Sequence, residues 1–82
     1  MTQIKVLFFA TLKDRVGIKQ VVVNLPDPLR VAELRNRLSG EFPQAREALS
    51  KCLVAVNQEF AFDQDIVPPG AEVAFFPPVS GG

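Results

Sequence analysis

The pattern of apolar residues constrains this fold most, because five short β-prone segments surround one amphipathic helical segment. The β-prone segments are residues 4–10, 20–25, 52–57, 60–62 and 72–76. The helical segment covers residues 30–39, where Val31, Leu34 and Leu38 recur at helical spacing, and Gly40 is expected to cap it. One helix has a single apolar stripe, so this stripe must be buried against one face of a sheet.

The order of these segments is strand, strand, helix, strand, short strand, strand. This order predicts one α+β domain over residues 1–82, with the β-grasp plan of a mixed sheet packed on one main helix. We expect the last strand to lie in the centre of the sheet, beside the first. Residues 11–19 are predicted to form a loop, Pro43 to start a short helical turn, and Pro68-Pro69-Gly70 to form a type II turn.

The composition argues against several classes of function. Lys and Arg total 9 and Asp and Glu total 9, and this balance argues against nucleic acid as a partner. There is no His and a single cysteine, Cys52, so we expect no bound metal, no resident cofactor and no stand-alone catalysis. No apolar run approaches the roughly 20 residues of a membrane span. Without a secretory signal in residues 1–5, and with one cysteine, we expect a cytoplasmic protein that has no membrane partner.

The chain ends in Ser80-Gly81-Gly82, which contributes little to stability because glycine is costly to order and has no side chain. The stiff Pro77-Pro78 pair is expected to project residues 77–82 as a tail with a slender tip. A carboxylate at Gly82 is a poor electrophile and needs activation, for instance as an acyl-adenylate made from ATP. The chain has no residues for that step, so we expect a partner enzyme to perform it. The opposing interpretation is a frayed, unreactive terminus.

The seven phenylalanines are the only aromatic residues. Three share the parity of core positions: Phe8, Phe62 and Phe75. Three others are expected to be exposed near the root of the tail as a partner interface: Phe9, Phe60 and Phe76.

The remaining polar residues are predicted to be structural. Cys52 is expected to be a small apolar residue at the start of a buried strand rather than the carrier of sulfur. Asp63 and Asp65 are expected in a turn. Four arginines are expected to form a solvated surface, with electrostatic steering of a partner as the lesser alternative: Arg30, Arg35, Arg37 and Arg46.

Three segments resemble the small, sulfur-carrying subunit of molybdopterin synthase. They are Ile4–Ala10, Leu53–Gln58 and the terminal decapeptide Val73–Gly82, in that order, and the resemblance extends over essentially the whole chain. The decapeptide is the most specific of the three. The resemblance implies a ubiquitin-like β-grasp fold with a free C-terminal tail.

The resemblance also implies a mechanism. A ubiquitin-activating-like adenylyltransferase would adenylate the carboxylate of Gly82 with ATP, and a sulfur donor would convert it to a thiocarboxylate. The tail would then enter the large catalytic subunit of a heterotetramer and deliver sulfur to cyclic pyranopterin monophosphate. Apolar residues at Phe9, Phe60 and Phe76 would contact both enzymes. The tail residues that would enter the large subunit are Pro77, Pro78, Val79, Ser80 and Gly81.

Alternative functions remain open. A thiamine-pathway sulfur carrier also ends in Gly-Gly, although Phe-Phe-Pro-Pro does not usually precede the glycines there. A ubiquitin-like modifier would be conjugated to lysine through Gly82, but ubiquitin has arginines before its glycines, whereas residues 76–80 here carry no charge. A pure interaction module would have a terminus that never reacts.

Overall fold

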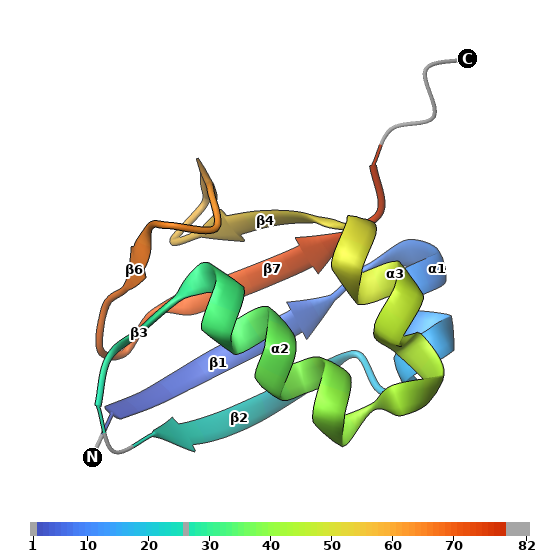
Figure 1. The fold of residues 1–82 in the computed structure, drawn as a ribbon, viewed down its shortest axis with the longest axis horizontal. Coiled ribbons are helices and arrows are strands. Elements are labelled where there is room, and N and C mark those ends of the chain that lie inside the picture. Colours follow the sequence, from blue (N-terminus) through green and yellow to red (C-terminus); the bar gives the residue numbers. More distant parts are fainter. Residues whose placement is uncertain (1, 26, 79–82) are drawn as a thin grey trace.

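The computed structural model describes residues 2–25 and 27–78, which form a five-stranded mixed sheet with helices packed against it (Figure 1). The strands of this sheet are β1 (Thr2–Phe8), β2 (Gln20–Leu25), β4 (Leu53–Val56), β5 (Glu59–Ala61) and β7 (Glu72–Phe76). Their order is β2-β1-β7-β4-β5, with β1 and β7 parallel and the other neighbours antiparallel. The predicted α+β β-grasp fold is confirmed, including the central position of the last strand beside the first.

Two further strands, β3 (Leu29–Arg30) and β6 (Ile66–Val67), pair with each other in a separate two-stranded sheet. The sequence did not predict them, because a two-residue strand is too short to show alternation.

The core lies between one face of the sheet and the main helix, α2 (Val31–Glu41). Parallel pairing of β1 with β7 places Phe8 opposite Phe75, and both side chains are buried. The α2 helix contributes the predicted apolar stripe, which is fully buried: Val31, Leu34 and Leu38. Figure 1 shows α2 lying across the strands on this face.

The end of α2 differs from the prediction, because Gly40 lies inside the helix and does not cap it. The helix continues through Glu41, and Phe42 is the cap residue, with φ −123° and ψ 70°. Phe42 precedes Pro43, and a residue before proline is sterically driven out of the α region. The proline therefore ends the helix, and Gly40 does not need to adopt a left-handed conformation.

Residues 11–19 were predicted to be a loop, and this prediction is wrong for most of the segment. Helix α1 spans Ala10–Val16 and buries Leu12 and Val16, which lie four residues apart on one face. Gly17, with φ 96°, ends it in a left-handed conformation and donates its N–H to the carbonyl of Lys13 at 2.8 Å. The charged residues between the two apolar ones hid this short helix.

The short turn predicted after Pro43 is present as the 3-10 helix η1 (Pro43–Ala45) followed by α3 (Arg46–Lys51). Ala45 and Leu49 point into the core as expected. The turn into β7 is also confirmed, because Gly70 has φ 75° and the N–H of Ala71 donates to the carbonyl of Pro68 at 3.2 Å.

Candidate functional site

The root of the predicted tail is the end of β7, which is held by hydrogen-bonded strands on both sides. Phe75 pairs with Phe8 of β1, and Phe76 pairs with Leu53 of β4. The N–H of Phe9 donates to the carbonyl of Phe75 at 3.1 Å. This pairing anchors the chain immediately before Pro77.

Pro77 is half-buried and Pro78 is exposed, and both follow directly from the central strand (Figure 1). Val79, Ser80, Gly81 and Gly82 lie outside the described residues. The prediction that residues 77–82 project as a tail, and the reactive role of Gly82, therefore stay predictions.

The three phenylalanines predicted at the interface lie around this root. Phe60 is 73% exposed and Phe9 is 47% exposed, while Phe76 is half-buried. The rings of Phe60 and Phe76 pack together with centroids 5.9 Å apart. Phe9 lies on the β1 side of β7 and Phe60 on the β5 side, so the aromatic side chains flank the root on both sides. Their contact with a partner stays a prediction.

These aromatic residues belong to the outer face of the sheet, opposite α2. In residues 2–25 and 27–78 no helix covers the exposed apolar side chains Val22, Leu53 and Phe60 on this face. Leu53 was not predicted as a site residue, although its place opposite Phe76 puts it beside the root. An exposed apolar surface of this kind is typical of a protein–protein interface.

Phe62 was predicted to be in the core, but it is 69% exposed. Phe62 has the same strand parity as the exposed Phe60, whereas Ala61 between them packs against the core, so the prediction assigned Phe62 to the wrong face. The chain then turns as predicted for Asp63 and Asp65. The N–H of Phe62 donates to Asp65 Oδ2 at 2.7 Å, and the N–H of Asp65 donates to the Phe62 carbonyl at 2.9 Å.

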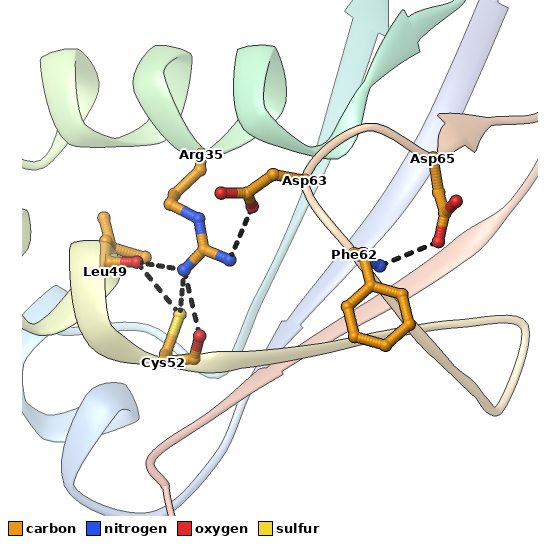
Figure 2. Close-up of polar contacts among 6 residues, drawn as sticks. All are labelled: Arg35, Leu49, Cys52, Phe62, Asp63 and Asp65. Atoms are coloured by element: carbon orange, nitrogen blue, oxygen red, sulfur yellow. Dashed lines mark hydrogen bonds and ion pairs between the residues drawn. The ribbon is translucent and has the colours of Figure 1, made fainter.

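Arg35 was predicted to be a solvated surface residue, and this prediction is wrong. Only 16% of its side chain is exposed, and its guanidinium contacts three parts of the chain (Figure 2). Nη1 donates to the carbonyls of Leu49 at 2.6 Å and Cys52 at 2.9 Å, at the end of α3, where carbonyls have no partner within the helix. Nη2 forms an ion pair with Asp63 Oδ1 at 3.1 Å. Its position four residues after the buried Val31, at the edge of the apolar stripe, was the available signal.

The other arginines predicted to be at the surface are exposed: Arg30, Arg37 and Arg46. Arg30 nevertheless has a structural contact, because its Nη1 donates to the carbonyl of Gln64.

Cys52 is buried, as predicted for a small apolar residue. Its thiol donates to the carbonyl of Leu49 at 3.1 Å and accepts from Arg35 Nη1 at 3.3 Å (Figure 2). Burial raises the pKa of this thiol, with the Arg35 guanidinium opposing the shift. A buried, protonated thiol is a weak nucleophile, and this does not favour Cys52 as a sulfur carrier.

Two further properties concern the described part of the chain. Residues 2–25 and 27–78 contain no cluster of three or more His, Cys, Asp or Glu side chains that could hold a metal ion. None of the helices in those ranges has the length and apolar character required to cross a membrane.

Comparison with known sequences gives consistent matches. The profile of the ThiS family matches residues 6–82. A Dictyostelium discoideum protein named molybdopterin synthase sulfur carrier subunit is 40% identical over 83 residues, covering 98% of this chain and 96% of that protein. The Escherichia coli protein of the same name is 41% identical over 81 residues, covering 96% of this chain and 99% of that protein.

Solved structures share the fold over nearly the full length. A putative molybdopterin converting factor subunit 1 from Pyrococcus furiosus is 23% identical and superposes with a TM-score of 0.85, covering 96% of this chain and all (100%) of that chain. Small archaeal modifier protein 1 of Haloferax volcanii is 24% identical, with a TM-score of 0.84 and the same coverage of 96% and 100%. A complex of subunits 1 and 2 of molybdopterin-converting factor from Helicobacter pylori contains a chain that is 23% identical, with a TM-score of 0.65, covering 98% of this chain and 99% of that chain.

Proposed function

Since this chain belongs to the ThiS family, we propose that it is a sulfur carrier in molybdenum cofactor biosynthesis, acting as the small subunit of molybdopterin synthase. The observation that carries the proposal is a family match that continues to Gly82, combined with 40% and 41% identity to named sulfur carrier subunits. The anchored root of the tail supports the same role.

In the proposed reaction, a carboxylate oxygen of Gly82 attacks the α-phosphorus of ATP and pyrophosphate leaves. Hydrosulfide from the donor then attacks the acyl carbon of the adenylate, AMP leaves, and loss of the S–H proton leaves Gly82 with a thiocarboxylate. An adenylyltransferase partner supplies the activation and a separate donor supplies the sulfur, because the chain has neither His nor an exposed thiol for these steps. ATP and a sulfur donor are both available in the cytoplasm, where we place the reaction.

The second subunit of molybdopterin synthase is the proposed recipient of the sulfur, which it would transfer to cyclic pyranopterin monophosphate. A complex of subunits 1 and 2 in the Helicobacter pylori relative supports pairing with such a subunit. The arrangement of this chain fits delivery of a tail. Phe60 and Phe76 form an apolar contact beside Pro77, so a partner can hold the body while the tail enters its active site. Two small and two large subunits would form the heterotetramer.

Intact-mass measurement tests the proposal. After incubation with the adenylyltransferase, ATP and a sulfur source, the mass should correspond to one oxygen replaced by sulfur, and fragmentation should place the sulfur at Gly82. Cys52→Ala should be loaded as fully as the wild-type chain, whereas deletion of Gly82 should prevent loading without unfolding the domain. Loading that disappears in Cys52→Ala would refute the terminal thiocarboxylate.

Assays of conjugation and of sulfur transfer, together with the intact mass, distinguish the alternative functions. Lysine conjugates formed through Gly82 in a cell extract would support a protein modifier, a name carried by the Haloferax volcanii structure with the same fold. Transfer of sulfur to a thiamine precursor, without transfer to cyclic pyranopterin monophosphate, would support the thiamine pathway. An unchanged mass under all conditions would support a pure interaction module.

A further inference from the structure

An open groove of about 580 Å³ lies next to the root of the tail, on the β4–β5 side. Its lining includes the apolar side chains Leu53, Phe60 and Phe62, together with Arg35 and Cys52. Phe62 is 69% exposed, and neither the core nor the predicted interface accounts for it. The groove is continuous with the predicted docking surface, which consists of Phe9, Phe60 and Phe76 around the tail root with Leu53 beside them. Leu53 pairs with Phe76, and the ring of Phe60 packs on the ring of Phe76.

One wall of the groove is formed by Phe62, Asp63 and Gln64, which belong to a turn of residues 62–65 that is hydrogen-bonded at several points to the start of α2. The N–H of Val31 donates to the Asp65 carbonyl at 2.9 Å, and the N–H of Ala32 donates to the Asp63 carbonyl at 3.1 Å. Backbone N–H groups in the first turn of a helix have no partner within the helix. Residues 62–65 therefore accept hydrogen bonds from the free N–H groups at the start of α2, and these bonds fix the position of the segment.

Arg35 connects this segment to the other side of the groove. One end of its guanidinium holds Asp63, and the other holds the carbonyls of Leu49 and Cys52, immediately before Leu53 (Figure 2). The planar guanidinium can serve both sides at once, whereas a lysine ammonium is a single point and cannot span them. The carboxylate of Asp63 also pairs with the guanidinium charge, so this wall of the groove carries little net charge.

We propose that Arg35 is a positioning residue that holds Phe62 opposite Leu53, and that the resulting groove receives an apolar side chain of the subunit that accepts the tail. This inference rests on the proposed function, because it takes the second subunit of molybdopterin synthase as the occupant. Continuity with the tail root favours this occupant: a protein that encloses the chain beyond Pro77 must lie over Phe76 and hence beside the groove.

Binding of the purified full chain to the second subunit, measured by calorimetry, tests the groove. Phe62→Ala should weaken binding about tenfold, because the exposed ring would be buried in the complex. Arg35→Lys should weaken it at least about threefold through loss of positioning. Arg37→Lys is the matched control, since Arg37 lies on the same helix and its only ion pair among the described residues is an exposed one with Glu41 at 3.9 Å. It should bind like the wild-type chain.

A double-mutant cycle separates positioning from general stability. If Arg35 acts through Phe62, adding Arg35→Lys to Phe62→Ala should cause almost no further loss of affinity. Amide hydrogen exchange of residues 62–65 should be faster in Arg35→Lys and unchanged in Arg37→Lys. Asp63→Asn, at a side chain that is 60% exposed, provides a second variant that keeps the α3 contacts of Arg35 and should reproduce the loss if Arg35→Lys does not fold.

The outcomes are distinct. Wild-type affinity for Phe62→Ala, or additive losses in the cycle, would overturn the inference while leaving the sulfur carrier intact. Loss of binding to the adenylyltransferase alone would also overturn it, because the occupant would be a different enzyme. A wild-type chain that neither accepts sulfur at Gly82 nor binds the second subunit would overturn the proposed function, and this inference with it.

Discussion

Truncation of Phe60 should weaken partner binding more than it weakens the fold, and Phe75 provides the matched comparison. Phe75 is fully buried, whereas Phe60 is 73% exposed in the free chain. Complete burial of a phenylalanine side chain contributes about 1.5–3 kcal/mol. For Phe60, about three quarters of that remains to be gained when a partner covers it, which corresponds to a roughly 6- to 40-fold change in Kd.

For the stability of the fold the order should be reversed, with Phe75→Ala destabilising the domain much more than Phe60→Ala. Phe60→Ala loses a small buried fraction and the ring contact with Phe76, so its free energy of unfolding should fall by about 0.5–1.5 kcal/mol. Phe75→Ala removes a core side chain and leaves a cavity, at a cost of about 3–5 kcal/mol. A domain of this size is stable by only about 4–12 kcal/mol, so Phe75→Ala should be much more sensitive to denaturant.

Urea denaturation followed by circular dichroism measures stability, and calorimetric titration with the second subunit measures affinity. Equal destabilisation of the two variants would place Phe60 in the core and refute the assignment of faces. Unchanged affinity of a folded Phe60→Ala chain would refute the docking surface at the tail root.

Four further predictions concern stability. Gly40→Ala should raise the free energy of unfolding by about 0.5–1 kcal/mol, because Gly40 is an exposed position inside α2 with open space around it. Gly70→Ala, at φ +75°, should lower the free energy of unfolding by about 1 kcal/mol. A urea denaturation in which Gly70→Ala is the more stable of the two variants would contradict the helical conformation of Gly40 and the left-handed conformation of Gly70. Leu12→Ala should cost about 2–5 kcal/mol, whereas a value typical of an exposed position would remove α1 from the core. Burial raises the pKa of the Cys52 thiol above its ordinary 9.0, so the folded state holds this proton more tightly than the unfolded state. The free energy of unfolding should therefore fall as the pH rises above 9.0, where the unfolded chain begins to lose the thiol proton. A fall that persists unchanged in Cys52→Ala would show that the Cys52 thiol is not its cause.

The sheet was predictable because its signals are local. Short β-prone apolar runs bounded by turn residues located β2 at Gln20–Leu25 and β7 at Glu72–Phe76. The turn at Gly70 followed from proline and glycine at adjacent positions. These features depend on residues that are close together in the sequence, so the sequence alone is enough to predict them.

The errors arose where distant residues decide the structure. Helix α1 has only two buried side chains, Leu12 and Val16, and it is stabilised by packing rather than by its own pattern. Gly40 had the residue type of a helix cap, but Pro43 determined where α2 ends. Phe62 was assigned to the core, although it shares the parity of the exposed Phe60, and only the packing of Ala61 against the core shows which face of β5 points inward.

The order of residues along the chain is sufficient for the reactive chemistry that we propose. The absence of His, the Pro77-Pro78 pair and the terminal glycines are properties of composition and order, and they predict Gly82 as the reacting group without any contact being known. The surroundings of the tail root depend instead on tertiary contacts. Arg35 reaches Leu49 and Asp63 across 14 and 28 positions of the sequence. Local periodicity indicates which face of an element is apolar, but not which distant segments meet there, so the Arg35 contacts and the groove beside Phe62 became apparent only from the folded chain.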